Sequence, residues 1–367
     1  MSFVVRRLWP ALPVLLALGC ASSSGAPAAA PTLTDAEAKQ SIVTGMHDSI
    51  LVDIDALVAA SEEIARLAPT PSGRGWDAAA DAAAITQMRA AWTRARTAYE
   101  HIEGAVAPLF PDLDLVLDAR YDDFLGELKS KGGDADLFDD QGVTGLHAVE
   151  RILWSDSIPA RVVEFEKAQP GYLPAAYPKT EQEAVAFKTK LCARVVADAK
   201  SLRAQWVPQR IDLGGAFQGL VSLMNEQREK VNKASTNTEE SRYSQRTMAD
   251  IRGNLEGTQK IYALFQPWLA SKQSADATKD GKATDAAIAD GFRKLGALYA
   301  GTTGDAIPQP PTSWSAESPS PADLESPFGK LYTGVKAAAD PDAKGSIVGE
   351  MNRAADILGF PEFKAGQ

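Results

Sequence analysis

The sequence predicts an all-α fold built as two packed helix bundles. Apolar residues recur every three or four positions in long segments, as at Ile42, Met46, Ile50, Ile54 and Leu57, which would share one helix face. No Asn-Gly or Asp-Gly turn joins two alternating apolar runs, so hairpin signals are missing. The 367 residues, 45% hydrophobic and 23% charged, suffice for two soluble globular domains.

The first twenty residues are typical of an export signal. A basic pair precedes an apolar run that is too short to remain as a membrane-spanning helix. The run ends in Ala-Leu-Gly-Cys, a pattern typical of bacterial lipoproteins, in which Cys20 would be the lipidated first residue. An ordinary signal peptide that contains a cysteine is the alternative. Residues 21–33 are small, polar and proline-containing, which favours a flexible linker.

Helical patterns follow one another through the rest of the chain. Residues 34–68 open with the capping-box sequence Thr34 to Glu37, and residues 180–206 open with another. A second long helix is expected over residues 81–110, ending near Pro108. Further helical patterns cover residues 215–235, 247–271, 284–301 and 345–358.

Two segments have no helical pattern and indicate how the chain is divided. Residues 156–179 could separate two bundles, and residues 307–327 are expected to form a Pro- and Ser-rich surface loop. We therefore expect an N-terminal bundle over residues 34–170 and a C-terminal bundle over residues 171–367, after a signal peptide (1–20) and a linker (21–33).

A histidine and a glutamate stand three residues apart in the apolar stretch "TGLHAVERILW". On a helix that begins near Thr144, His147 and Glu150 would be neighbours and could point at one ion. The positive end of the helix dipole would favour the neutral imidazole, which is the form that binds metal. One polar edge of a buried helix is the alternative, because such a pair arises by chance.

Polar and aromatic residues share a second helix face. Trp92, Arg96, Tyr99 and Glu103 recur at helical spacing, and such a face is either a solvated surface or one wall of a polar cavity. Five aspartates then crowd residues 112–123, either as capping residues of a loop or as carboxylates that converge on the His147 pair.

A third group of polar residues lies near residue 250. Thr247 and Asp250 form a possible capping box, whereas Asn254 continues a polar stripe into the helix. Arg242 and Ser244 just before this helix could line the mouth of a cleft.

Taken in order, the export signal, the helical body, "AWTRARTAYEHIE", "GLHAVERILW" and "SRYSQRTMADIRGNLEG" resemble the imelysin-like family over roughly residues 34–360. That family includes imelysin, the iron-regulated protein A group and the metal-binding domain of EfeO-type iron-uptake lipoproteins. The resemblance implies two helix bundles, an envelope location and a metal site whose ligands are Glu103, Asp118, His147 and Glu150. Trp92, Arg96, Tyr99, Arg120, Arg242, Ser244, Asp250 and Asn254 are the residues expected around it.

One imidazole and several carboxylates suit iron, with zinc or manganese as alternatives. The net charge of −10 fits a protein that holds cations and argues against a nucleic-acid partner. The expected partners are the metal ion, a bacterial membrane through the lipid anchor and an iron-uptake protein. The protein would face the periplasm from the inner or outer membrane.

Two other functions stay open. The family resemblance also carries a peptidase assignment, but no catalytic residue is assigned, because no glutamate in these motifs would remain as a general base if all four residues bind metal. A module that binds a polymer or a partner is the other alternative.

Overall fold

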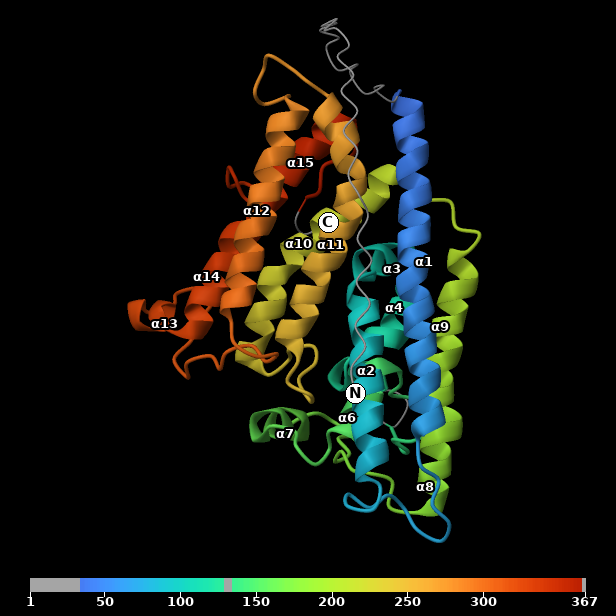
Figure 1. The fold of residues 1–367 in the computed structure, drawn as a ribbon. Coiled ribbons are helices and arrows are strands. Elements are labelled where there is room, and N and C mark those ends of the chain that lie inside the picture. Colours follow the sequence, from blue (N-terminus) through green and yellow to red (C-terminus); the bar gives the residue numbers. More distant parts are fainter. Residues whose placement is uncertain (1–33, 129–133, 365–367) are drawn as a thin grey trace, which may run out of the picture.

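The computed structural model describes residues 34–128 and 134–364, and it confirms the all-α prediction: these two ranges contain helices and no strand (Figure 1). The predicted signal peptide, the linker and Cys20 lie outside the described residues. In these ranges, no helix combines the length and the apolar character that crossing a membrane requires.

One group of helices is arranged along α1 (Asp35–Leu67), which packs against both α2 (Ala82–Glu100) and α9 (Cys192–Trp206). The predicted capping box of Thr34 and Glu37 is confirmed, and the predicted apolar face of α1 is buried. Thr180 caps α8 (Glu181–Ala186) in the same way. A π-helical turn, η2 (Phe187–Leu191), joins α8 to α9, and both η2 and α9 pack on α1.

A second group packs around an aromatic core that includes Phe217, Phe265 and Phe360. Side chains of Asp212, Asp280, Ser326 and Ser346 accept hydrogen bonds from backbone N–H groups in the first turns of four of its helices, which fixes where these helices begin. The group consists of α10 (Leu213–Asn232), α11 (Thr247–Ser271), α12 (Gly281–Gly301), α14 (Pro327–Ala339) and α15 (Ile347–Leu358).

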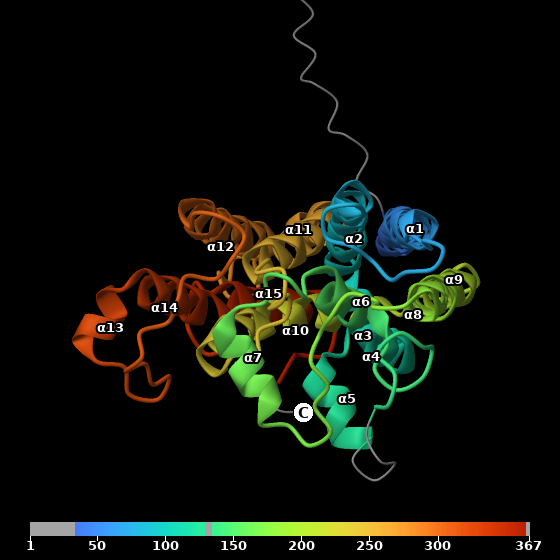
Figure 2. The ribbon, with the colours of Figure 1, turned by 90° about the horizontal axis from the view of Figure 1, so that it is seen from below.

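Helix α11 connects the two groups, because it packs on α1 and α2 as well as on α10 and α12. Figure 2 shows α10 and α11 between α2 on one side and α12 and α14 on the other. Several short helices lie near this junction. They are α3 (Glu103–Leu109), α4 (Pro111–Asp118), α5 (Tyr121–Leu128), α6 (Gly145–Leu153), α7 (Ala160–Lys167) and the 3₁₀ turn η3 (Lys233–Thr236).

Three expectations about helices were wrong. The helix expected over residues 81–110 is interrupted at His101 and Ile102, where α11 comes so close that a Cβ on Gly257 would lie 2.3 Å from the His101 carbonyl oxygen. Residues 156–179 contain α7, and residues 307–327 contain the short helix α13 (Pro321–Glu325). Pro159 and Pro321 stand where these helices begin, a position at which proline is well tolerated.

Candidate metal centre

The predicted helix at "GLHAVERIL" is α6, and its first residue brings it onto the end of α4. Thr144 is the N-cap, as expected, and Gly145 has a φ of 87°. A Cβ on Gly145 would lie 2.4 Å from the backbone oxygen of Val116, so only glycine permits this approach. The contact places His147 of α6 next to Asp118, the last residue of α4.

His147 is fully buried and uses its two ring nitrogens differently. Nδ1 lies 2.7 Å from Glu150 Oε2, and Nε2 lies 3.4 Å from Asp118 Oδ1. Among the described residues, no well-aligned hydrogen bond reaches Nε2. Burial and the Arg96 charge act to lower the pKa of His147, but the contacts with Asp118 and Glu150 outweigh them and raise it above the ordinary value, which is opposite to the effect expected from the helix dipole.

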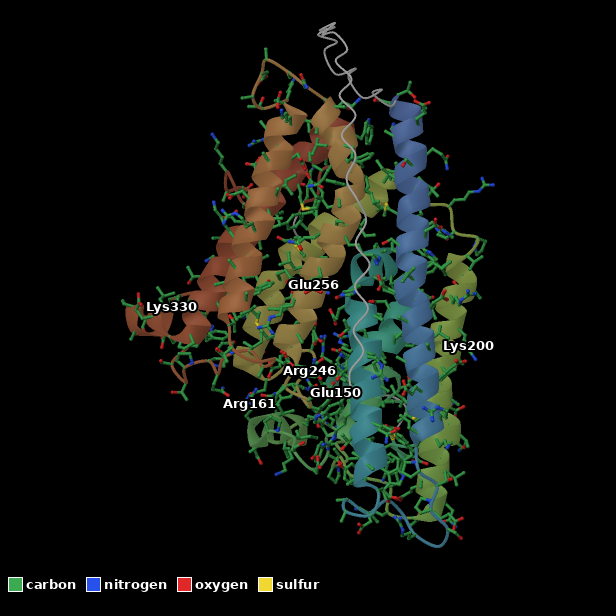
Figure 3. All side chains as sticks on the ribbon, viewed as in Figure 1. Glu150, Arg161, Lys200, Arg246, Glu256 and Lys330 are labelled. Atoms are coloured by element: carbon green, nitrogen blue, oxygen red, sulfur yellow. The ribbon has the colours of Figure 1, made fainter. Side chains whose placement is uncertain are left out.

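Glu150 lies on the side of the imidazole that faces away from Asp118. Its Oε1 accepts hydrogen bonds from the backbone N–H of Ser244, at 2.8 Å, and from the Ser244 hydroxyl, at 2.7 Å. Its Oε2 faces His147 Nδ1. In Figure 3, Glu150 lies low in the molecule, near Arg246. Glu150 therefore holds the imidazole in place and directs Nε2 toward Asp118.

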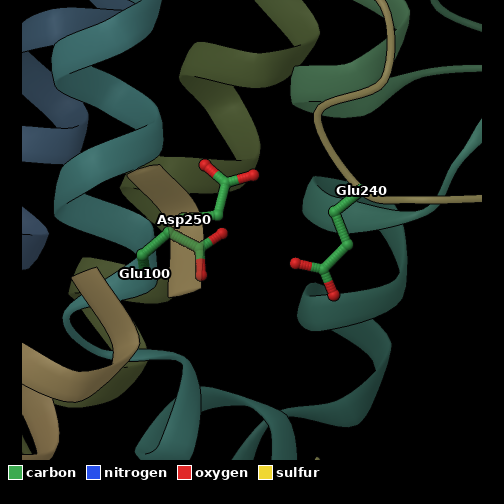
Figure 4. A group of neighbouring side chains, drawn as sticks. All are labelled: Glu100, Glu240 and Asp250. Atoms are coloured by element: carbon green, nitrogen blue, oxygen red, sulfur yellow. The ribbon is translucent and has the colours of Figure 1, made fainter. Parts of the chain in front are cut away.

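Arg96 lies at the centre of a buried carboxylate cluster. Its side chain is 2% exposed and contacts Asp118 and Glu100 directly. Glu240 lies 3.4 Å from Nη2, and Asp250 lies 3.5 Å from Nε. Glu100, Glu240 and Asp250 also offer oxygen atoms that all lie within 4.8 Å of one another. Figure 4 shows these three carboxyl groups turned toward a common centre from α2, α11 and the segment before α11.

The buried acids differ in how readily they ionise. Burial raises the pKa of Glu100 well above its ordinary value and that of Asp250 to about 6. Burial would also raise the pKa of Asp118 and Glu240, but nearby positive charges reverse this effect. Arg96 and His147 lower the pKa of Asp118, and Lys230 with Arg96 lowers that of Glu240 to about 2. Asp118 and Glu240 are therefore the ionised members of the group.

Glu103 occupies a neighbouring position and is already paired. Lys230 Nζ contacts both of its carboxylate oxygens, at 2.7 and 2.9 Å, and also Glu240 Oε1 at 2.9 Å. Asn254 donates hydrogen bonds to Glu103 Oε2 at 2.8 Å and to Glu100 Oε2 at 2.5 Å. Lys230 and Asn254 thus link Glu103 to the Arg96 cluster.

The face of Trp92, Arg96, Tyr99 and Glu103 is buried between helices. Trp92 is 0% exposed and donates to the Leu146 carbonyl oxygen, so it fixes α2 against α6. Tyr99 is equally buried and donates to Asp114. Arg120, also expected near the site, pairs with Asp123 at 3.1 Å.

Arg242 belongs to a second buried cluster beside the first. It contacts Asp122 and lies 3.4 Å from Glu166 Oε1, which also accepts the Tyr243 hydroxyl at 2.5 Å. Arg151 Nε donates to Glu166 Oε2 at 3.0 Å. One glutamate therefore serves two buried arginines.

The capping box predicted for Thr247 and Asp250 was wrong. Arg246 is the N-cap of α11 and makes no side-chain cap bond, and Asp250 faces Arg96 instead. Sequence reasoning also missed Glu100, Glu240 and Lys230. The four-residue spacing of Arg96 and Glu100 could have revealed Glu100. Glu240 and Lys230 carry no local signal, because Arg96 and Glu103, the site residues that they contact, lie more than a hundred residues away.

Helices from distant parts of the chain thus form an all-α protein with a buried histidine–carboxylate centre. The chain belongs to the imelysin family, whose family model matches residues 47–313.

Curated relatives include proteins described as Efem/EfeO family lipoproteins from Staphylococcus aureus strains MW2 and COL. Each is 30% identical over 188 residues, which is 51% of this chain and 52% of the relative. The matched stretch thus spans about half the length of these relatives. A solved structure described as an iron-regulated protein A precursor from Parabacteroides distasonis has a similar fold. Its TM-score is 0.53 at 12% identity, over 90% of this chain and 97% of that one.

Proposed function

We propose that this protein binds a metal ion, with iron as its cargo, and serves iron uptake as a lipid-anchored protein of the bacterial envelope. The names of the relatives support the link to iron and the lipoprotein location. The observation that carries the proposal is His147 Nε2, a buried nitrogen directed at a carboxylate without a well-aligned partner among the described residues.

The donor set fits such an ion. His147 Nε2 and Asp118 Oδ1 are 3.4 Å apart, a separation compatible with two ligands that each bind one ion at about 2.0–2.2 Å. Glu100, Glu240 and Asp250 supply further carboxyl oxygens. All three contact Arg96, which also contacts Asp118. One imidazole with carboxylates suits iron, zinc or manganese.

The geometry favours different roles for the other two residues expected as ligands. Both oxygens of Glu150 already have partners, so we assign Glu150 the role of orienting His147. Glu103 is held by Lys230 and Asn254, and we assign it to the outer part of the site.

Thermal unfolding of the metal-free chain with added ferrous, ferric, manganese or zinc ions tests the proposal. We expect a selective increase in Tm, because a ligand that binds only the folded state stabilises it, by about 2.7 kcal/mol at a hundredfold excess over Kd. His147→Ala should abolish the increase. His101→Ala is the matched control, since His101 contacts Asp53 and Glu256 instead. An equal response of wild type and His147→Ala would refute the site.

The peptidase alternative needs one further assay. Cleavage of an unfolded protein substrate that is lost in His147→Ala would favour it over a carrier. A carrier should leave that substrate intact at every metal concentration.

A further inference from the structure

We propose that Arg96 is a built-in competitor for the metal, whose guanidinium occupies the ligand set and must give up Asp118 before an ion can bind. The inference rests on the proposed function and concerns how the same site is regulated. Its ligand class is a small cation of charge two or three.

The central observation is that a single oxygen atom, Asp118 Oδ1, lies close to both Arg96 and His147. Asp118 Oδ1 accepts a hydrogen bond from Arg96 Nη1, and the same Oδ1 lies 3.4 Å from His147 Nε2. An ion held by His147 Nε2 and Asp118 Oδ1 would lie where the positive guanidinium now contacts that oxygen. The two positive charges would repel each other and compete for the same oxygen.

Arg96 is shared among more carboxyl groups than Arg151. Arg151 is fixed by directed bonds to Glu166 at 3.0 Å and to the Leu173 carbonyl oxygen at 2.6 Å, and the Tyr121 ring lies 3.8 Å away. The Arg96 guanidinium contacts four carboxyl groups. Two of them, Glu240 and Asp250, lie 3.4 and 3.5 Å away. Among the described residues, Arg96 Nε makes no hydrogen bond. Such contacts can be exchanged for those of another cation without leaving a fixed partner unpaired.

The charges around Arg96 also favour exchange. Four carboxyl groups surround one guanidinium, and Lys230 stays with Glu103 and Glu240 at the outer side of the cluster. An ion of charge two or three would bring more positive charge to these carboxyl groups than one guanidinium does. In the metal-free protein, Arg96 supplies the charge that makes their burial tolerable.

Arg96→Met tests the inference through two effects of opposite sign. Without metal, the variant should unfold at a lower temperature than wild type, because buried carboxylates lose their counter-ion. Its metal Kd, measured by competition with a chelator, should fall about tenfold or more, if the conformation with Arg96 displaced makes up about a tenth or less of the wild-type population.

Arg89→Met is the matched control on the same helix. Arg89 contacts Asp156 and the Leu153 carbonyl oxygen, away from the cluster, so this variant should keep the wild-type Kd. A folded Arg96→Met protein with an unchanged or weaker affinity would overturn the inference.

Two outcomes separate this inference from the proposed function. If His147→Ala abolishes metal binding in the wild type but Arg96→Met does not tighten it, only the inference fails. If Arg96→Met is unfolded without metal, saturating metal must refold it, because the ion would supply the missing charge. A chain that stays unfolded in saturating metal contradicts the inference.

Discussion

The interior of the molecule differs between the aromatic core of the second group of helices and the junction of that group with α2 and α6. Around α10, α11 and α15, aromatic rings pack against one another, as Phe217 does on Phe265 at a centroid distance of 5.1 Å. Where α2 and α6 meet the segment before α11, the interior instead holds Arg96, Arg151 and Arg242, each at most 2% exposed, with their carboxylates.

This difference distinguishes the apolar region, which only stabilises the fold, from the charged region, for which we propose a further role. Burying charges carries a desolvation penalty of several kcal/mol per ion, and apolar side chains of similar volume often stabilise a fold better. A region that only had to join helices could therefore be apolar, as it is around Phe217. The charged region instead contains the residues of the proposed metal site.

The largest effect is expected from Glu166→Gln in the charged region. The change keeps the shape of the side chain but removes the charge that Arg151 and Arg242 share. We expect a loss of about 3–5 kcal/mol in the free energy of unfolding, the usual result of breaking a buried ion pair. Denaturant unfolding measures it, with the exposed Glu164→Gln as the control. A loss within the error of that control would show that buried charge is tolerated here.

A pH-dependent effect is expected from Asp114→Asn at the border of the charged region. Burial and the charge of Asp118 raise the pKa of Asp114 from 3.8 to about 7. The folded protein therefore holds this proton more tightly than the unfolded chain, and the wild type loses stability as pH rises from 3.8 to about 7. Asparagine cannot ionise, so the Tm of the variant should exceed that of wild type by a few degrees more at pH 8 than at pH 4.

Thermal unfolding across that pH range measures the difference. Asp112→Asn, a change at an exposed residue of the same helix, is the control. Parallel pH profiles of wild type and Asp114→Asn would contradict the raised pKa.

The smallest effect is expected from Phe265→Leu in the apolar region. Phe265 is 0% exposed, but leucine preserves the apolar character and much of the volume. We expect a loss of about 1.5 kcal/mol or less, the usual result of a conservative change in a core. The metal-dependent increase in Tm should be unchanged. A loss as large as that of Glu166→Gln would remove the contrast between the two regions.

The sequence predicted best what local patterns determine. The buried face of α1, two capping boxes and the start of α6 at Thr144 follow from residues close together in the chain. Of the residues expected at the metal centre, His147, Glu150 and Asp118 lie together. The break at His101 was not predicted, and it lies against Gly257, which is remote in sequence but adjacent in space. Glu240 and Lys230 were missed because the site residues that they contact are likewise remote in sequence.

Residues that pair within the charged region are far apart in the sequence, and this separation affects how the chain folds. Arg96 meets Glu240 across 144 positions, and Lys230 meets Glu103 across 127. Contacts between such distant residues close large loops and generally form late in folding. The contacts of Arg96 with Glu240 and of Lys230 with Glu103 would then form only when α2, α3, α10 and the segment before α11 have docked. A half-folded chain could bring His147 next to Asp118 without Glu240 and Asp250, so the full proposed ligand set would form only in the docked chain.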